Sequence, residues 1–263
     1  ELLYEEGGSE AITIGNPCPI AAADGTIHLL FCRNNQAAFV MKSTDDGKTF
    51  SKPVEITESL RPFRFPFRRI GTGPVHGIQM ASGRLVAPLW INDKIGREYR
   101  SAVAYSDDGG TTWEAGGIVP PEVRGLNECS VVELDGGKLL LNMRNREAKC
   151  RATATSEDGG LTWSSPQLAS DLVDPQCQGA MLGLGAAHGG RLLFSNAAAT
   201  SRKQMTVRAS DDGGKTWSVV CVLHEGPAAY SDLAAAGDVV LCLYESGINS
   251  PHEEIILARW KME

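Results

Sequence analysis

The sequence predicts an all-β protein built as a β-propeller, and three observations lead to this fold class. The pattern Ser-x-Asp-x-Gly-x-Thr-aromatic occurs four times, and its first serines are 63, 50 and 54 residues apart. Glycine-containing bends separate short strand-like runs, and no long segment has the periodicity of a helix. A repeat of about 50 residues is typical of propeller blades or of another repeat array. We expect about five four-stranded blades in a single domain, residues 1–263.

Each copy of the repeated pattern predicts a tight turn that follows a strand. Aspartate can bond nearby backbone amides, glycine can adopt a positive φ, and the final aromatic ring can cover the turn. The four copies occupy residues 43–50, 106–113, 156–163 and 210–217. We therefore interpret their aspartates as turn-forming rather than catalytic residues: Asp45, Asp108, Asp158 and Asp212.

Further hairpins are expected between the copies. The clearest joins two apolar runs within residues 130–143 through Asp135-Gly136-Gly137, and residues 80–85 and 188–192 have the same character. A last unit, roughly residues 228–260, contains strand-like runs but no copy of the pattern.

Composition excludes several classes of function. The net charge is −7 and the cations are scattered, which argues against a nucleic-acid partner but allows a few buried arginines to hold an anion. No run of about 18 apolar residues is present, so we expect no membrane span. The seven cysteines form no CxxC pair, and we expect no metal and no cofactor. We interpret Cys32, Cys221 and Cys242 as small core residues.

The compartment is left open. The first residues do not resemble a signal peptide, and free-looking cysteines slightly favour a soluble cytoplasmic protein. Secretion or a periplasmic location remains an alternative if a leader was lost upstream.

A second set of residues lies outside the repeated turns. Glu128 follows Asn127, and Arg144 comes sixteen residues later; Arg202 precedes Tyr230 by twenty-eight residues, and Glu245 lies fifteen beyond Tyr230. This ordered set, together with the four turns, resembles the bacterial exo-α-sialidase (neuraminidase) family over almost the entire chain. The turns match the Asp boxes, or BNR repeats, of that family.

The resemblance implies a sialidase-type β-propeller, with six blades in the complete family fold, and a set of residue roles. Tyr230 would be the nucleophile and Glu128 its general base. Arg144 and Arg202 would belong to the arginine triad that binds the carboxylate of sialic acid, and Glu245 would orient the remaining arginine. Gln178 is a candidate for the pocket lining. We interpret His76 as a structural or rim residue, and Arg146 and Arg208 as solvated surface charges.

Elementary chemistry agrees with these roles. Sialic acid carries a carboxylate on its anomeric carbon, which would repel a carboxylate nucleophile. A neutral phenol avoids that repulsion if a nearby glutamate accepts its proton. Sialidases with a tyrosine nucleophile are a known exception to the two-carboxylate scheme of glycosidases.

The sequence departs from the family at one point. The family begins with an Arg-Ile-Pro signature and an acid/base aspartate, and neither is found upstream of residue 15, where the second blade is expected to begin. Phe63-Arg64-Phe65-Pro66 imitates the signature, but we interpret Arg64 as chance or as a loop cation. Three explanations stay open: an incomplete product, a ring closed by five blades, or a blade supplied by another chain through a homodimer or blade exchange.

We therefore expect a sialidase acting on sialoglycoconjugates, with activity reduced by the missing residues. One alternative is a propeller that binds sialic acid or another anionic sugar without catalysis. Another is a hydrolase with an altered substrate range.

Overall fold

The chain folds into consecutive antiparallel sheets, as the repeated turns predict. The computed structural model describes residues 2–8, 11–63, 65–93 and 98–262, so Arg64 lies outside the described residues. Short 3₁₀ turns occur at Glu58–Leu60, Asp135–Gly137 and Ala186–His188. Within the described part, no helix has the length and apolar composition needed to cross a membrane.

The first three sheets follow one another along the sequence. The first contains β1 (Ile14–Ala21), β2 (Ile27–Arg33), β3 (Ala37–Ser43) and β4 (Val54–Glu55). The second contains β5 (Phe67–Thr72), β6 (Ile78–Gln79), β7 (Leu85–Asp93), β8 (Tyr99–Ser106) and β9 (Glu114–Ile118). The third contains β10 (Leu126–Glu133), β11 (Leu139–Asn145), β12 (Cys150–Ser156) and β13 (Gln167–Val173).

The last sheet has six strands because one long strand serves two units. Its strands are β14 (Ala180–Gly183), β15 (Leu192–Ala197), β16 (Lys203–Ser210), β17 (Ser218–Ala236), β18 (Val239–Ser246) and β19 (Glu254–Lys261). The first half of β17 pairs with β16, and the second half, from Ala228, pairs with β18. The fourth unit thus has four strands. The fifth uses the second half of β17, β18 and β19, and so has three.

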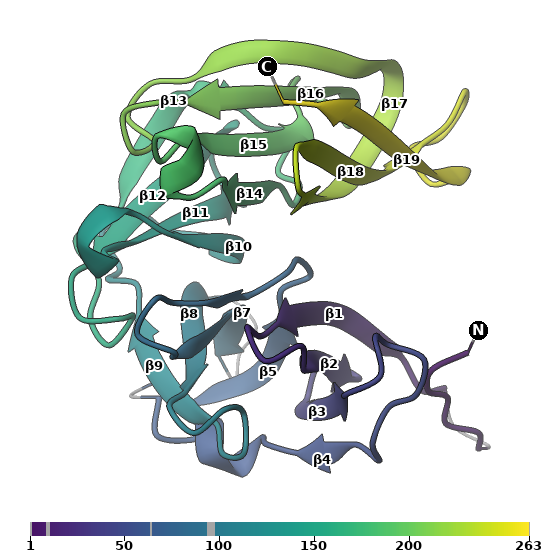
Figure 1. Cartoon of the computed structure of the whole chain (residues 1–263), viewed down its shortest axis with the longest axis vertical. Helices are drawn as coiled ribbons and strands as arrows, with labels where there is room; N and C mark the ends of the chain where they lie inside the picture. The colour runs from purple at the N-terminus through teal and green to yellow at the C-terminus, as the bar shows by residue number, and fades with distance from the viewer. Residues whose placement is uncertain (1, 9–10, 64, 94–97, 263) are drawn as a thin grey trace.

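The sheets are arranged as in a propeller, with apolar cores between neighbouring sheets. Figure 1 shows β10 and β14 near the centre, with the other strands of their sheets lying outward. One core joins the first sheet to the second, with Leu30 and Leu89 fully buried; another joins the second to the third, with Val103 and Leu141. These cores confirm the predicted fold class.

The repeated aspartate turns form as predicted, between the last two strands of each of the first four units. Ser106 Oγ donates to Asp108 Oδ1 at 2.8 Å, and Thr112 Oγ1 donates to Asp108 Oδ2 at 2.6 Å. Matching bonds occur in the other three copies. Bonds from Thr112, followed by those from other turn residues, lower the pKa of Asp108 to about 2. Gly110 adopts φ +75°, and a Cβ there would come within 2.4 Å of the His28 ring.

Two-residue bulges occur in the first strand of the first, third and fifth units. In each, two consecutive residues face one residue of the next strand: Asn16-Pro17 face Phe31, Asn127-Glu128 face Arg144, and Ala229-Tyr230 face Glu245. A bulge leaves the ladder locally unpaired and redirects a side chain, and bulges are common beside active sites. Two of these bulges involve four of the residues to which the sequence assigned roles.

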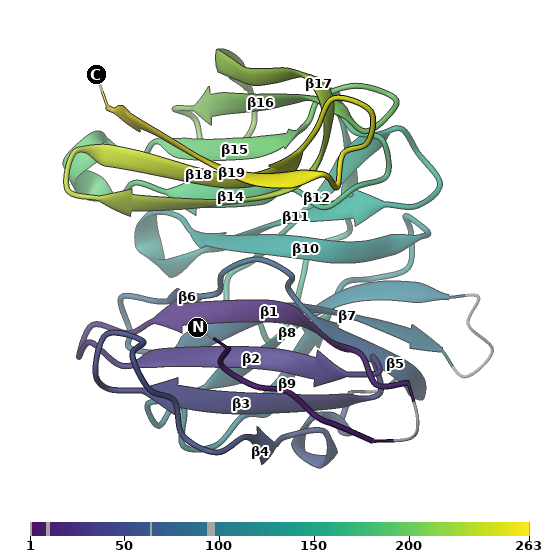
Figure 2. The same ribbon diagram turned by 90° about the vertical axis from the view of Figure 1, so that its right-hand side faces the viewer.

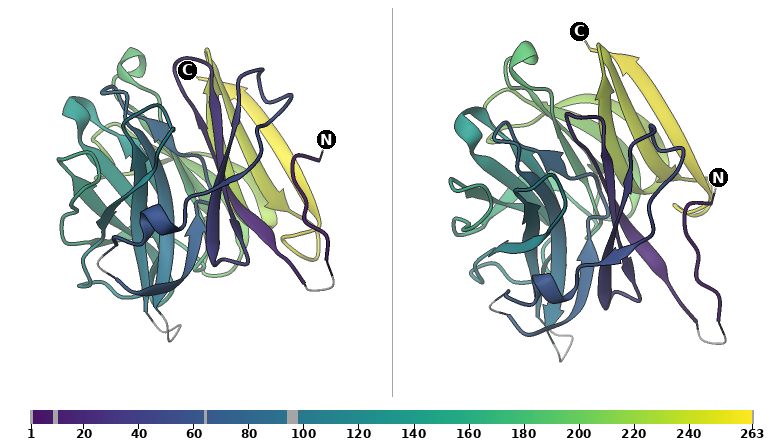
Figure 3. Two further views of the ribbon diagram at one scale, coloured as in Figure 1. Left: turned by 90° about the horizontal axis from the view of Figure 1, so that it is seen from below. Right: turned by 60° about the horizontal axis from the view of Figure 1, so that its bottom comes forward.

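The first and last sheets approach each other on one side of the molecule. Figures 1 and 2 show β1 and β2 in the lower half of the molecule and β18 and β19 in the upper half. Figure 3 shows the same two groups of strands from below. The loop between β5 and β6 connects them. Gly77 N donates to Pro19 O of β1, while His76 N and Nδ1 lie 3.0 and 2.6 Å from the two carboxylate oxygens of Asp232 in β17. The loop that carries His76 thus links β1 to β17.

Candidate active site

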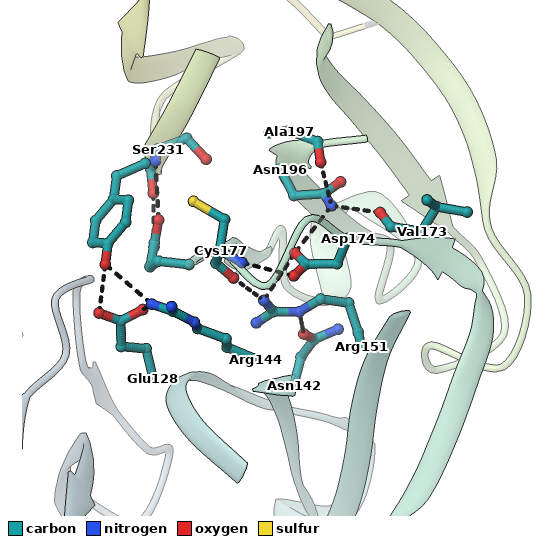
Figure 4. A network of polar contacts seen from close by, with 12 residues as sticks. Glu128, Asn142, Arg144, Arg151, Val173, Asp174, Cys177, Asn196, Ala197 and Ser231 are labelled. Carbon is teal, nitrogen blue, oxygen red and sulfur yellow. Dashed lines mark hydrogen bonds and ion pairs between the residues drawn. The ribbon is translucent and has the colours of Figure 1, made fainter. Parts of the chain in front are cut away.

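Tyr230, Glu128 and Arg144 meet although they come from distant parts of the chain. Tyr230 Oη donates to Glu128 Oε1 at 2.6 Å. Arg144 Nη1 donates to Glu128 Oε2 at 2.6 Å and to Tyr230 Oη at 3.3 Å. Figure 4 shows Glu128 and Arg144 next to each other at its left-hand side. The phenol is therefore held between a carboxylate that can accept its proton and a guanidinium.

The bulges explain why these three side chains converge. Glu128 is the second bulge residue of β10 and faces Arg144 on β11, while Tyr230 is the second bulge residue of β17. Tyr230 N donates to the side chain of Glu245 at 3.2 Å. Without the extra residue, the two-residue periodicity of a strand would send the following side chains to the opposite face.

Burial and charge determine the protonation of Tyr230. Burial, and then the neighbouring Glu128 carboxylate, raise the pKa of Tyr230 well above its usual value, while Arg144 opposes this. Burial alone would lower the pKa of Arg144, but the Glu128 carboxylate outweighs it and raises that pKa. Tyr230 is thus a neutral phenol near neutral pH, with an acceptor for its proton already in contact.

Arg202 completes the polar surroundings of Tyr230 from the loop between β15 and β16. Its guanidinium carbon lies 5.5 Å from the centre of the Tyr230 ring, within the range of a cation–π contact. Arg202 Nη1 lies 3.4 Å from His252 Nε2, and His252 Nδ1 lies 3.1 Å from Glu245 Oε2. A neutral His252 protonated on Nδ1 satisfies both contacts, because it donates to Glu245 and accepts from Arg202.

An open cavity of about 520 Å³ lies in front of Tyr230. Glu128, Tyr230 and Glu245 line one side, and Pro17 of β1 and Leu29 of β2 line the other. The cavity therefore lies where the first and last sheets face each other. Its walls are both polar and apolar.

Gln178 lies beside this group, but its side chain is buried. Its Nε2 donates to Ser231 O at 2.9 Å and its Oε1 accepts from Ser231 N at 3.0 Å. The residue is only 1% exposed. Both ends of the amide thus bind the backbone next to Tyr230.

Comparison with known proteins agrees with this architecture. The family model described as BNR repeat-like domain matches residues 5–242. The chain belongs to the BNR repeat-like domain family. Within curated proteins, this BNR chain is 36% identical over 233 residues to a sialidase of Micromonospora viridifaciens, covering 84% of this chain and 35% of that protein. It is 34% identical over 226 residues to a sialidase of Bacteroides fragilis, covering 82% and 40%.

A solved structure gives the same result. The Hadza microbial sialidase Hz136 matches this BNR chain with a TM-score of 0.85 at 28% identity, over 95% of this chain and 53% of that one. The predicted resemblance to sialidases is confirmed. The chain spans roughly a third to a half of the length of these relatives.

The structure brings together five residues that the sequence selected: Glu128, Arg144, Arg202, Tyr230 and Glu245. Their chemical roles stay predictions. In the described part of the chain, the Glu245 carboxylate contacts His252 Nδ1 at 3.1 Å, whereas the resemblance implied that it would orient an arginine. Sequence reasoning missed His252, although Pro251-His252 after the Glu245 strand could have marked it as a loop residue close to that carboxylate.

Proposed function

We propose that this chain is the catalytic propeller of an exo-α-sialidase-like glycoside hydrolase that releases terminal sialic acid with retention of configuration. The observation that carries the proposal is the 2.6 Å hydrogen bond from Tyr230 Oη to Glu128 Oε1, with Arg144 and Arg202 beside it. The curated names of the relatives support the substrate class.

In the first step, the Tyr230 oxygen forms a bond to the anomeric carbon of sialic acid, and the bond from that carbon to the aglycone oxygen breaks. The phenolic proton passes to Glu128, which already accepts a hydrogen bond from it. Because Tyr230 is neutral before attack, it does not repel the substrate carboxylate. Its raised pKa makes transfer to Glu128 necessary for attack.

In the second step, water attacks the anomeric carbon and the bond to Tyr230 breaks. The Tyr230 oxygen recovers its proton from Glu128, and the proton lost by the attacking water passes to solvent. Two inversions at one carbon retain the configuration. The same Tyr230–Glu128 pair thus serves both steps in opposite directions.

The substrate carboxylate would be bound by Arg144 and Arg202. Planar guanidinium groups form paired, charge-assisted hydrogen bonds with a carboxylate. Both arginines approach the Tyr230 side chain, Arg144 at its oxygen and Arg202 over its ring. This would place the anomeric carbon, which bears the carboxylate, close to the nucleophile.

The leaving group decides how much acid assistance the first step needs. The aglycone oxygen of a natural sialoside must gain a proton as it leaves. An aryl oxide leaves without that proton. We therefore expect faster turnover of aryl α-sialosides than of natural ones.

The test is hydrolysis of an aryl α-sialoside by the purified chain, followed by proton NMR. The α anomer of sialic acid should appear first and then convert to the β anomer in solution. Appearance of the β anomer first would reject the retaining mechanism. Binding of sialic acid with no turnover after long incubation would indicate a carbohydrate-binding propeller.

A further inference from the structure

A fully buried ion pair lies behind the candidate active site, at residues that the proposed reaction does not use. Arg151 Nη1 is 3.2 Å from Asp174 Oδ2, and both side chains are 0% exposed. Arg151 comes from β12, and Asp174 follows β13. Figure 4 shows the pair to the right of Glu128.

Both residues of the ion pair form hydrogen bonds to the backbone of one short segment. Arg151 Nη1 donates to Cys177 O at 2.6 Å, and Cys177 N donates to Asp174 Oδ1 at 2.8 Å. The backbone N–H of Cys177 is therefore bound by Asp174, and its backbone carbonyl is bound by Arg151. The short segment 174–178 cannot shift along the sheet without breaking charge-assisted hydrogen bonds.

Other polar groups lock the pair in place. Asn142 Oδ1 accepts from Arg151 Nε at 2.7 Å, and Asn196 Nδ2 donates to Asp174 Oδ2 at 3.4 Å. Arg208 Nη1 donates to Asn196 Oδ1 at 3.0 Å. The interpretation of Arg208 as a solvated surface charge was therefore wrong, and burial lowers the pKa of its guanidinium.

The segment ends at the residue that holds the strand of the nucleophile. Gln178 makes two hydrogen bonds to Ser231, one through each end of its amide. Ser231 follows Tyr230 directly, at the point where β17 resumes its pairing with β18 after the bulge. Gln178 therefore supplies the backbone bonds that fix the end of the bulge on the side facing β14.

A buried ion pair adds little net stability, because desolvation of both charges offsets much of their attraction. A geometric role explains better why two charges lie where neither meets solvent nor the cavity. The bulge that carries Tyr230 lacks regular ladder bonds, so its conformation depends on such side-chain contacts.

We infer that Arg151 and Asp174, acting through Cys177 and Gln178, position the Tyr230 phenol against Glu128. The role of this chain of contacts in catalysis rests on the proposed sialidase function, whereas its role in ordering residues 229–231 does not. Gln178 is accordingly a positioning residue and not part of the substrate-contacting surface.

Two substitutions of Gln178 test the inference. Gln178→Met keeps the length of the side chain and removes both bonds to Ser231. Gln178→Glu keeps the shape, and only its protonated carboxyl group can donate to Ser231 O while accepting from Ser231 N. Gln167→Met, at an exposed glutamine of β13, is the matched control. Arg151→Lys tests the other end of this chain of contacts, because lysine keeps the positive charge but lacks the planar guanidinium and its several donors.

With an aryl α-sialoside, Gln178→Met and Arg151→Lys should lower kcat at least about tenfold while KM changes by less than about threefold, since misplacement of a reacting group acts on the chemical step. Gln178→Glu should approach the wild-type kcat only at acid pH. The kcat of the variant is divided by the wild-type kcat at each pH, so the titration of the groups around Tyr230, which both proteins share, cancels. An unchanged kcat, or a rise confined to KM, would overturn the inference.

A second readout is independent of turnover. Backbone hydrogen exchange of a peptide covering residues 228–236 should be faster in Gln178→Met and Arg151→Lys than in wild type and in Gln167→Met. If the wild-type chain hydrolyses nothing, the proposed function fails, but faster exchange still supports positioning. Unchanged exchange in both variants would refute it whatever the activity.

Discussion

Tyr230 Oη donates a 2.6 Å hydrogen bond to Glu128 Oε1 although the two residues are 102 positions apart in the chain. Each is the second residue of a two-residue bulge, one in β17 and the other in β10. Arg144, opposite the β10 bulge, donates to both. The contact therefore depends on two local irregularities in separate sheets and on the propeller arrangement that makes them face each other.

Removing the Tyr230 oxygen should abolish turnover. We expect Tyr230→Phe to lower kcat on an aryl α-sialoside by about a thousandfold or more, because the nucleophile itself is lost. Binding of sialic acid, measured by calorimetry, should persist, since Arg144 and Arg202 remain. Tyr105→Phe, which removes a phenol bonded to Glu114 elsewhere, is the control. Substantial turnover by Tyr230→Phe would rule out Tyr230 as the nucleophile.

Replacing Glu128 by glutamine should act on the proton rather than on binding. Glu128→Gln removes the proton acceptor and should lower kcat by about a hundredfold or more. It also removes a negative charge beside Tyr230, so the pKa of Tyr230 should fall relative to wild type while burial keeps it above the usual value. Ultraviolet titration of the phenol, with Tyr230→Phe subtracted, measures that pKa. A pKa that stays the same or rises would contradict the assigned electrostatics.

Arg202 and His252 should be coupled in carboxylate binding. Arg202→Ala should weaken sialic acid binding about tenfold or more, because charge-assisted bonds are lost. His252→Ala should weaken it less, since it only frees Arg202 and Glu245 from each other. In the double variant the losses should be smaller than their sum. Arg191→Ala, at a surface pair with Asp211, should leave the Kd unchanged. Strict additivity would show that His252 does not orient Arg202.

The His76–Asp232 contact should make stability depend on pH. Burial alone would lower the pKa of His76, but the charge and hydrogen bond of Asp232 outweigh it and raise that pKa. The stabilisation is therefore complete below the unfolded histidine value of about 6.5 and is lost as pH rises through the higher folded value.

Asp232→Asn should accordingly lower the melting temperature more at pH about 5.5 than at pH about 8.5. Comparison with Asp238→Asn, at an exposed pair with Lys261, separates this effect from general surface charge. An equal shift at both pH values would mean that His76 does not change protonation across this range.

Much of the fold could be predicted because it is encoded in local patterns. The four Ser-x-Asp-x-Gly-x-Thr-aromatic copies contain, within eight residues, every group that their turns use, as Ser106, Asp108 and Thr112 show. The apolar runs before them supply the strands. What could not be foreseen is that β17 continues without interruption from the fourth unit into the last, because Gly226-Pro227 is typical of a turn and the last unit was expected to begin near residue 228.

Arg151 illustrates what local pattern hides. Alternation along β12 groups it with Thr153 and Thr155, which are only partly buried, yet Arg151 is completely buried. It is covered by residues 174–178, which follow the end of the next strand, β13, and bind its guanidinium. Gln178 was selected from the sequence as a pocket residue, but only its contacts with Ser231 reveal where its amide is bound.

The sequence by itself therefore determined the all-β class and the repeated turns, and it selected Tyr230, Glu128, Arg144, Arg202 and Glu245 as candidate site residues. The tertiary structure alone decided that the first two are joined by a hydrogen bond, that Glu245 contacts His252, and that Arg151 and Asp174 support the strand of Tyr230. The physical reason is the separation along the sequence of the residues that are in contact. A turn closes through bonds within a few residues, whereas the site is assembled from bulges and loops of separate sheets, whose relative positions depend on how the apolar cores between those sheets pack.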